Sequence, residues 1–535
     1  MDSYDYIIVG SGSGGGFAAL RLSENPDTRV LILEAGLSDA HWTTRIPAGA
    51  RYTFEGGPRN WAFETEPEPH LNGRRLFQPR GKVVGGSSSL NGMVWVRGHR
   101  MDYDDWAAGG ATGWGYDDVL PYFRSIERHT SIASPARGQS GPVQIKRFGD
   151  HHPIEAAFLE ASAQAGHALP GDYNGAEQEG ATAFDANIDN GWRSGTARAC
   201  VNPAAKRPNV TLATEAQVTR ILVENGRAIG VRYRRNGQDK EARTDGEVVL
   251  AAGAFQTPQL LMLSGIGPAA HLKEHGIDVI ADLPGVGQNL QDHLEVHLKH
   301  LCPHKGMSMN HLLARHRILM AGAEWYLFKT GPAASSPSRV GAFFRSAPDL
   351  AYPNIQFHFW PYFLEGWAPP PDKDGYCFDV GPVRSDSRGW VRLRSADPFA
   401  KPLIQLNGLA TDKDLAEFRA AIALARDIAA QPAFDFCRGP EVSPGPEVTS
   451  DADLDAYVRA NANSAYHPCG TAKLGKDQMA VVDPEARVHG IEGLRIADAS
   501  IMPTITNGNI NAPAMMIGEK VAHMMLGRQL ATVAA

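Results

Sequence analysis

The glycine-rich turn at residues 10–15 contains the first residues in the chain whose types and spacing could do chemistry. It reads GSGSGG and puts Gly10, Gly12 and Gly15 at the glycine positions of a G-x-G-x-x-G motif. The first glycine of such a motif permits a tight turn, the second lets the backbone approach a pyrophosphate, and the third allows a helix to pack closely on a strand. Free N–H groups at the start of that helix can bind phosphate oxygens. The turn predicts a dinucleotide site and admits NAD and FAD equally.

A single acidic residue, Glu34, follows a second apolar segment at residues 30–33. It lies 24 residues after Gly10, where a carboxylate can accept hydrogen bonds from ribose hydroxyls. The same negative charge would repel a 2′-phosphate. We therefore expect NAD or FAD at this site and not NADP.

Histidines offer the other chemistry that the residues alone make visible. The chain has 19 of them, and a neutral imidazole can act as a general base near neutral pH. His467 precedes a proline, where a histidine is more often a hydrogen-bonded turn residue than a catalyst. His293 and His297 have the i, i+4 spacing of a zinc pair on a helix, but no third ligand is evident, so we expect no metal site. The absence of a G-x-S-x-G motif argues against a serine hydrolase.

The elements that must position these residues are those of an α/β protein. Apolar runs at residues 6–9, 30–33 and 247–252 are typical of buried parallel strands. Alternating apolar and polar residues at 355–359 and 390–393 predict antiparallel strands elsewhere in the chain.

These segments predict two interleaved domains. We expect a Rossmann-like dinucleotide-binding domain assembled from residues 1–40, 80–100, 210–290 and 460–535. The remaining residues, 41–79, 101–209 and 291–459, are expected to form mainly a substrate-binding α+β domain with a mainly antiparallel sheet, together with connecting segments.

Composition places the chain among ordinary globular proteins. It has 535 residues, 43% of them hydrophobic and 21% charged, and a formal net charge of −7, so we expect no nucleic-acid partner. Five widely spaced cysteines without a C-x-x-C motif are typical of free thiols in a reducing compartment. No secretory signal and no spanning apolar segment is visible, so we expect a cytoplasmic protein and leave peripheral membrane contact open.

Three further segments match the signature regions of one enzyme family. They are residues 81–93 (GKVVGGSSSLNGM), residues 253–267 with GAFQTP and SGIG, and Tyr466-His467-Pro468 together with residues 509–513 (NINAP). With the N-terminal turn, they make the chain resemble the glucose–methanol–choline (GMC) oxidoreductase family over essentially its full length. Within that family it is similar to choline dehydrogenases and related bacterial alcohol dehydrogenases and oxidases.

The resemblance implies FAD as the cofactor and a primary alcohol as the substrate. The alcohol would be oxidised to an aldehyde by proton abstraction and hydride transfer to flavin N5, with electrons passed to dioxygen or to a quinone or protein acceptor. His467 would be the base and Asn511 its asparagine partner, whose amide would donate to the developing alkoxide. Two alternatives stay open: choline dehydrogenase proper, and a GMC-type hydroxynitrile lyase that keeps FAD only as structure.

The resemblance also implies a set of cofactor contacts. It covers Gly10, Gly12, Ser13, Gly14, Gly15, Glu34, Gly85, Gly86, Ser88, Asn91, Gly92, Met93, Val94, Val218, Asp498, Ala499 and Asn509. Some relatives attach FAD covalently through a histidine immediately before the asparagine of the first signature. This chain has Leu90 there, so we expect non-covalent FAD.

Three residues are expected to contact the substrate: Trp61, Arg339 and Tyr466. Trp61 and Tyr466 fall where choline-oxidising relatives have aromatic residues, which suit a quaternary ammonium group. Arg339 aligns where choline dehydrogenases carry a glutamate, and a cation there would repel choline. This interpretation favours a neutral or anionic primary alcohol, with an aryl alcohol suggested by the many aromatic residues of the second domain.

Overall fold

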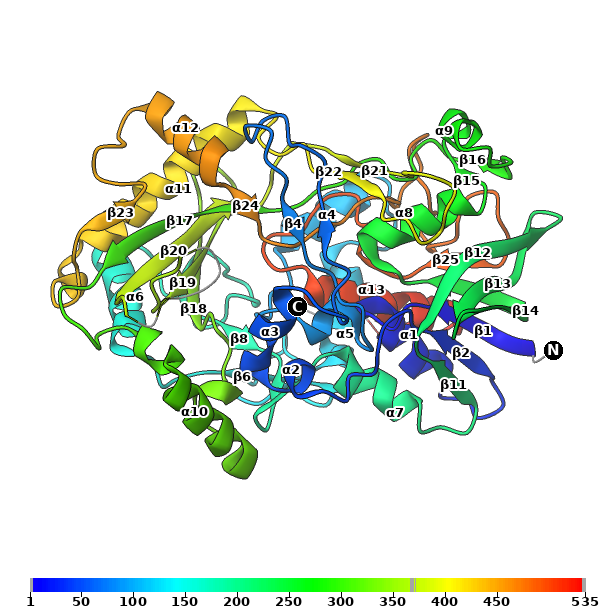
Figure 1. Cartoon of the computed structure of the whole chain (residues 1–535), viewed down its shortest axis with the longest axis horizontal. Coiled ribbons are helices and arrows are strands. Elements are labelled where there is room, and N and C mark those ends of the chain that lie inside the picture. The colour runs from blue at the N-terminus through cyan, green and yellow to red at the C-terminus, as the bar shows by residue number, and fades with distance from the viewer. Residues whose placement is uncertain (1–2, 366–369, 371, 532–535) are drawn as a thin grey trace.

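The computed structural model describes residues 3–365, 370 and 372–531, and two seven-stranded sheets dominate it. The first sheet lies in the right half of Figure 1 and the second in the left half. The structure is therefore of the α/β class, with a partly parallel sheet beside an antiparallel one, as the sequence predicts.

The first sheet has the strand order β11-β2-β1-β14-β13-β12, with β25 beside β14. Its strands are β1 (Ser3–Val9), β2 (Val30–Leu33), β11 (Val210–Ala213), β12 (Ala216–Glu224), β13 (Arg227–Arg235), β14 (Gln238–Leu250) and β25 (Leu494–Ile496). The pairs that join β11, β2, β1, β14 and β25 are parallel, and β12, β13 and β14 pair in antiparallel fashion. Every residue of β2 is buried, as in a parallel strand covered on both faces.

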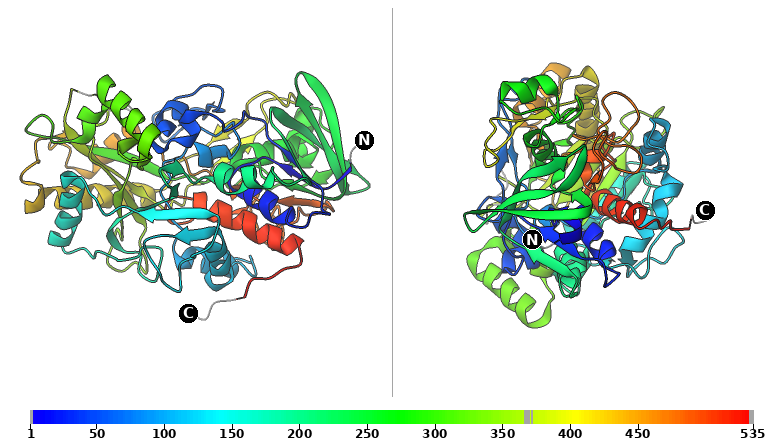
Figure 2. Two further views of the ribbon diagram at one scale, coloured as in Figure 1. Left: turned by 90° about the horizontal axis from the view of Figure 1, so that it is seen from below. Right: turned by 90° about the vertical axis from the view of Figure 1, so that its right-hand side faces the viewer.

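Two helices that are far apart in sequence, α1 (Ser13–Leu22) and α13 (Asn511–Met525), lie side by side next to this sheet. Both views of Figure 2 show α13 in red beside α1 in blue. A Cβ atom at Gly518 would lie 2.1 Å from the carbonyl oxygen of Gly14, and one at Gly14 would lie 1.8 Å from that of Ala497. Glycine is required at both positions because no side chain fits between backbones that approach so closely.

The second sheet has the order β23-β17-β20-β19-β18-β7, with β24 also paired to β17. Its strands are β7 (Gly180–Ala183), β17 (Leu294–Leu301), β18 (Val340–Phe344), β19 (Ile355–Trp360), β20 (Gly375–Pro382), β23 (Glu441–Ser443) and β24 (Asn463–Ser464). All their pairings are antiparallel. The antiparallel strands predicted at residues 355–359 and 390–393 are confirmed as β19 and as β21 (Trp390–Arg392), which pairs with β22 (Leu403–Gln405).

The second sheet has two chemically different faces because its strands alternate. One face is apolar and belongs to a core shared with α6 (Pro153–Gln164) and α11 (Asp412–Ala430). The core residues on its four central strands include Val296, Leu298, Val340, Ala342, Phe357, Phe359, Phe378 and Val380. The other face is polar, because the register places His297, Asp379 and His358 side by side on β17, β20 and β19.

The remaining elements are shorter or lie at the edges of the two sheets. The helices are α2 (Trp42–Arg45), α3 (Ala50–Phe54), α4 (Arg100–Ala108), α5 (Tyr116–Ile126), α7 (Asn202–Ala204), α8 (Gly253–Leu263), α9 (Ala269–Glu274), α10 (Arg315–Phe328) and α12 (Asp451–Asn461). The small strands are β3 (Phe63–Glu64), β4 (Phe77–Gln78), β5 (Glu127–His129), β6 (Val143–Arg147), β8 (Asp185–Ala186), β9 (Ile188–Asp189), β10 (Trp192–Arg193), β15 (Ile266–Gly267) and β16 (Ala281–Asp282). Among the described residues, no helix combines the length and apolar character needed to span a bilayer.

The chain passes between the two sheets more than once. The strands of the first sheet come from residues 3–33, 210–250 and 494–496, while β24, at residues 463–464, pairs with the second sheet. The exact domain boundaries given above stay a prediction.

Candidate active site

The glycine-rich turn leads from β1 into α1 with its backbone open on one side. Gly10 has φ of +97°, and a Cβ there would lie 2.5 Å from the carbonyl oxygen of Ala251. A Cβ at Gly15 would lie 2.1 Å from the carbonyl oxygen of Gly10, whereas a Cβ at Gly12 would meet nothing closer than 3.9 Å. No side chain caps the start of α1. Its first N–H groups are therefore available to an anion such as a pyrophosphate.

A cavity of about 330 Å³ begins at this turn and extends to His467. Most of the residues expected to contact the cofactor line it: Gly10, Gly12, Ser13, Gly14, Glu34, Gly86, Asn91, Gly92, Met93, Val94, Val218, Asp498, Ala499 and Asn509. Gly15, Gly85 and Ser88 lie outside its lining. Ser88 Oγ instead donates to the Gly85 carbonyl at 2.6 Å and accepts from the Thr196 amide at 3.0 Å. These groups therefore stabilise the loop without lining the cavity.

Two buried carboxylates shape the wall of this cavity. Glu34 accepts hydrogen bonds from the amide and hydroxyl of Ser11 at 3.1 and 2.6 Å, and from the Gly36 amide at 2.7 Å. Burial raises the pKa of Glu34. Asp498 accepts from the Gly253 amide at 2.9 Å and from the Thr257 hydroxyl at 2.6 Å, which fixes the start of α8 against the end of β25.

Asn511, the first residue of α13, also lines this 330 Å³ cavity. Its Oδ1 accepts a hydrogen bond from Ser13 Oγ at 2.7 Å, which joins the starts of α13 and α1. Its Nδ2 is buried and has no hydrogen-bond partner among the described residues. A buried amide donor left without a partner costs stability. The cavity therefore fits a bound group that offers an acceptor at this point.

His467 lies at the far end of the cavity, in the loop that follows β24. Asp292 anchors this loop: it accepts from the His467 amide at 2.7 Å and from the hydroxyl of Ser464. Tyr466 has φ of +65°, and its carbonyl accepts from Arg80 Nη2 at 2.7 Å. A positive φ at a tyrosine is uncommon and is maintained only by surrounding contacts. The strained turn and the Asp292 anchor together direct the imidazole.

The hydrogen bonds of two adjacent imidazoles assign the proton on His467. His293 Nε2 lies 3.1 Å from the carbonyl oxygen of Val383, which can only accept, so this nitrogen carries the proton. His293 Nδ1 is then an acceptor, and His467 Nδ1, 3.0 Å away, must donate to it. His467 Nε2 is left with a lone pair, and Asn509 Nδ2 donates to it at 3.1 Å. The second nitrogen of His467 is thus prepared to accept a proton.

Burial keeps this pair of histidines neutral. It lowers the pKa of His467 well below the usual range, with the nearby His293 adding to the effect, and it lowers the pKa of His293 to about 3. A neutral imidazole with a free lone pair is the form that a general base needs.

The structure separates the two asparagines that flank Ile510. Asn511, expected to donate to the substrate alkoxide, accepts a hydrogen bond from Ser13 Oγ and makes none with His467 among the described residues. Asn509, expected among the cofactor contacts, donates to His467 instead. Its Oδ1 accepts from Gln356 Nε2 at 3.2 Å, which fixes the direction of the amide. The hydrogen-bonding partner of His467 is therefore Asn509.

A second cavity, of about 1010 Å³, meets the first at His467 and Asn509. Leu90 and Tyr466 also line both. The polar face of the second sheet forms part of its wall with Glu295, His358, Trp360 and Asp379. His467 thus stands where the two cavities join. We call the first the cofactor cavity and the second the substrate cavity, after the contacts expected at each.

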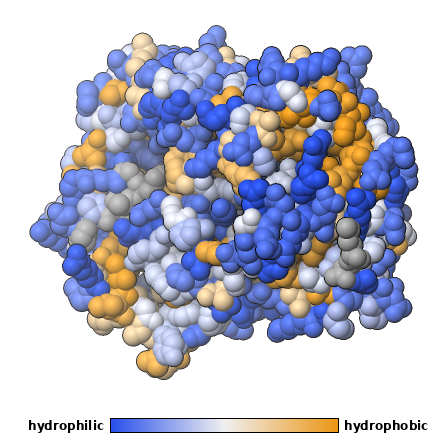
Figure 3. All heavy atoms as spheres, turned by 45° about the vertical axis from the view of Figure 1, so that its right-hand side comes forward, coloured by the Kyte–Doolittle hydropathy of each residue, from blue (hydrophilic) through white to orange (hydrophobic). Residues whose placement is uncertain are grey.

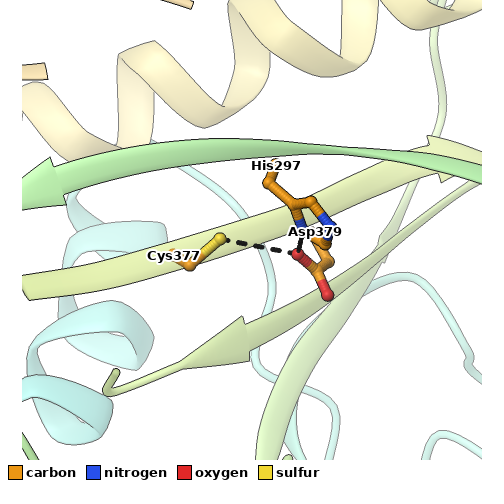
Figure 4. Close-up of side chains that lie close together, drawn as sticks. All are labelled: His297, Cys377 and Asp379. Carbon is orange, nitrogen blue, oxygen red and sulfur yellow. Dashed lines mark hydrogen bonds and ion pairs between the residues drawn. The ribbon is translucent and has the colours of Figure 1, made fainter. Parts of the chain in front are cut away.

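The carboxylate of Asp379, on this polar face, takes part in three hydrogen bonds. It accepts from Trp360 Nε1 at 2.6 Å and from Cys377 Sγ at 3.5 Å, and it forms a close hydrogen bond with His297. Figure 4 shows the cysteine and the histidine on either side of the carboxylate. Glu295, two residues before His297 on β17, makes no hydrogen bond through its carboxyl among the described residues although it is only 7% exposed. Burial, and then the charge of Asp379, raise its pKa well above the usual range.

The three groups of Figure 4 are also of types that bind metal ions, with ligand atoms within 4.8 Å of one another. Burial raises the pKa of the Cys377 thiol well above its usual range, and a protonated thiol is a poor ligand. The three groups already bond to one another, so we interpret them as a hydrogen-bonded cluster that orients Asp379. His293 directly precedes β17 and His297 lies on it, so their i, i+4 spacing falls on extended chain and not on a helix.

The three residues expected to contact the substrate do not all line the same cavity. Tyr466 lines both cavities, while Trp61 lines only the cofactor cavity, stacked on Phe63. Arg339 lines the substrate cavity, but its guanidinium is paired with Glu155, which is 1% exposed, and its Nε lies 3.1 Å from that carboxylate. Arg339 thus lies at the cavity, as expected of a substrate contact, and its positive charge is compensated by Glu155. Sequence reasoning missed Glu295, although the alternation of residues 294–301 marks it as belonging to the polar face.

Comparisons with known proteins agree with this geometry. Residues 4–295 and 385–518 match the N- and C-terminal models described as GMC oxidoreductase. The chain is 48% identical to an oxygen-dependent choline dehydrogenase of Brucella suis over 98% of this chain and 96% of that protein. It is 47% identical to the enzyme of the same name from Sinorhizobium fredii over the same shares. Among solved structures, a formate oxidase superposes with a TM-score of 0.93 at 31% identity over 98% of this chain and 99% of that one. Pyridoxine 4-oxidase from Mesorbium loti gives 0.88 at 30% over 97% and 99%.

Proposed function

The chain belongs to the GMC oxidoreductase family and is therefore an FAD-dependent oxidoreductase acting on CH–OH donors; we propose that its substrate is a primary alcohol with a cationic group, of which choline is the model. The observation that carries the proposal is the Glu295 carboxyl in the substrate cavity, which has no hydrogen-bond partner among the described residues. A cationic group beside it would compensate the charge of the ionised carboxylate, although a quaternary ammonium cannot donate a hydrogen bond to it.

The surroundings of Glu295 support a quaternary ammonium ligand. Trp360 and Tyr466 line the same cavity, and aromatic faces attract such cations. Asp379 adds a second negative charge, whereas the positive charge of Arg339 is compensated by Glu155. The names of the relatives from Brucella and Sinorhizobium also specify choline. These contacts replace the interpretation that favoured a neutral or anionic alcohol.

His467 acts as the general base in the proposed reaction. A hydroxyl group inserted between His467 and Asn509 donates its proton to His467 Nε2 and accepts a hydrogen bond from the Asn509 amide. The resulting imidazolium still donates through Nδ1 to His293. FAD, when bound, accepts the hydride that leaves the carbinol carbon, which yields the aldehyde.

The first cavity is proposed to hold FAD without a covalent bond. The free N–H groups at the start of α1 would bind the pyrophosphate, Glu34 would face the ribose, and Asn511 Nδ2 would donate to the cofactor. Leu90 lines the cavity at the position where a histidine attaches FAD in some relatives, and its side chain has no atom that could form such a bond.

The electron acceptor is proposed to be dioxygen or, alternatively, a quinone or protein. Two relatives are named oxygen-dependent, which supports dioxygen. We also propose a cytoplasmic location. All five cysteines are free thiols in the structure, which is the usual state in a reducing compartment.

Anaerobic mixing of the FAD-loaded enzyme with choline tests the proposal. We expect choline to bleach the flavin absorbance, and admission of air to restore it if dioxygen is the acceptor. His467→Ala should keep its flavin and lose about 100-fold or more in the rate of bleaching. Bleaching by benzyl alcohol in preference to choline would overturn the substrate assignment. No bleaching by any alcohol would favour a lyase with structural FAD.

A further inference from the structure

Helix α10 (Arg315–Phe328) is the least buried long helix of the molecule. It projects from the lower left of Figure 1 and from the lower left of the right-hand view of Figure 2. Trp325 is its only buried residue. That indole donates to the Gly191 carbonyl at 2.6 Å and meets Trp192 edge to face, with ring centres 4.6 Å apart. One tryptophan thus anchors the helix, and the outer surface lies open.

The outer surface of α10 is apolar. Leu319 is 74% exposed, Met320 59%, Tyr326 73% and Leu327 67%. Their spacing of i, i+1, i+7 and i+8 places these four side chains on one face of the helix. The lowest projection in Figure 3, which α10 forms, accordingly carries hydrophobic atoms on a mainly hydrophilic surface. A helix that is apolar on its outer face as well as its packed face is normally covered by something.

Unpaired cations lie next to this apolar face. The helix begins with Arg315, His316 and Arg317 and has no acidic residue in its first turn. All three are exposed, and neither arginine forms an ion pair within the described part of the chain. Two arginines at the positive end of a helix oppose its dipole, so an external anion would be stabilised there. The net charge of −7 for the whole chain does not reveal this local positive surface.

The position of α10 links this surface to the substrate cavity. Leu313, just before the helix, and Phe328 and Lys329, at its end, line the wall of the 1010 Å³ cavity. We propose that the outer face of α10 binds the surface of an anionic phospholipid bilayer. The apolar side chains enter the acyl boundary, and Arg315 and Arg317 bind lipid phosphates. The cavity then opens beside the membrane.

Vesicle flotation with the FAD-loaded enzyme tests this proposal. We expect the enzyme to float with vesicles of phosphatidylglycerol and phosphatidylcholine in equal parts, and to bind vesicles of phosphatidylcholine alone more weakly. L319E/L327E should reduce the bound fraction at least about tenfold. R315Q/R317Q should weaken binding to the anionic vesicles and remove most of its dependence on salt.

A matched control places the same substitutions on exposed apolar residues elsewhere. Leu169 is 51% and Ile280 41% exposed, so L169E/I280E should bind vesicles like the parent enzyme. All three variants should reduce a soluble dye acceptor at the parental rate, which confirms their fold. Failure of the parent to float, or equal flotation of L319E/L327E, would overturn the proposal. So would a dimer in gel filtration that L319E/L327E converts to a monomer without any vesicle binding, because the face would then bind a second copy of the chain.

Discussion

The proposed role of His467 as the base depends on which of its two ring nitrogens carries a proton. The Val383 carbonyl fixes the proton on His293 Nε2, His293 fixes the proton on His467 Nδ1, and the lone pair is left on Nε2. Burial holds both rings neutral. A chain of two ordinary hydrogen bonds thereby sets the tautomer that proton abstraction needs.

Replacing His293 should test this chain of hydrogen bonds. In His293→Phe the acceptor for His467 Nδ1 is lost, so the tautomer is no longer fixed. We expect the limiting rate of flavin reduction by substrate to fall about 10- to 100-fold, with little change in KM. His293→Gln, whose amide oxygen can accept, should recover part of the rate. An unchanged limiting rate in His293→Phe would show that the tautomer does not depend on His293.

The two asparagines around Ile510 should have separable roles. Asn509→Ala removes the donor to His467, so we expect the rate of flavin reduction to fall about 100-fold or more while FAD content is kept. Asn511→Ala removes the link to Ser13 and the unpaired cavity donor, so FAD should be lost on gel filtration. Flavin absorbance per protein and stopped-flow reduction measure the two effects. The opposite pattern would return the role beside His467 to Asn511.

At the level of elements, the packing of α1 against α13 depends on glycine. Gly518→Ala would put a Cβ 2.1 Å from the Gly14 carbonyl oxygen. We expect it to destabilise the holoenzyme by about 1–3 kcal/mol and to weaken FAD retention, since the cavity begins at α1. Gly322→Ala, in the exposed helix α10 where a Cβ meets nothing within 4 Å, is the matched control. It should be neutral or slightly stabilising. Thermal midpoints that fall equally in both variants would contradict this account.

The elements themselves were largely predictable, whereas the pairing of side chains across them was not. The turn at residues 10–15 and the strand at 355–359 have periodicities and glycine spacings that local physics imposes. Asn509 and Asn511 differ by two positions, but only the start of α13 decides that they point to different partners. Glu295 was overlooked because the residues of β20 and β19 that line the same cavity are distant in sequence. The ion pair that compensates Arg339 also comes from a distant helix, α6.

At the scale of the whole molecule, residues 463–525 connect the two halves of the proposed active site. They leave the second sheet at β24, carry His467 to the junction of the cavities, and return to the first sheet at β25 and α13. The antiparallel sheet supplies the polar wall for the substrate. The parallel sheet supplies the glycine turn for the cofactor. The proposed chemistry is therefore placed between the two sheets, where the two cavities join.

The charge of the substrate cavity should make catalysis depend on pH. Because the pKa of Glu295 is raised, the carboxyl is protonated well above the ordinary glutamate value of about 4.3. A cationic substrate favours the ionised form, so kcat/KM for choline should rise as pH increases through that pKa. For an uncharged alcohol, His467 is already neutral over this range, and we expect little dependence. A pH profile of choline oxidation that is identical in Glu295→Gln would contradict the role given to Glu295.

The most direct test of the central claim compares choline with its uncharged isostere, 3,3-dimethylbutan-1-ol, in the parent enzyme and in Glu295→Gln. The measured quantity is the ratio of kcat/KM for the two alcohols, from anaerobic flavin reduction. We predict that the parent prefers choline, and that Glu295→Gln lowers kcat/KM for choline about 100-fold while leaving the isostere nearly unchanged. A parent enzyme that prefers the isostere, or a variant that loses activity toward both alcohols equally, would contradict the assignment of a cationic alcohol to this site.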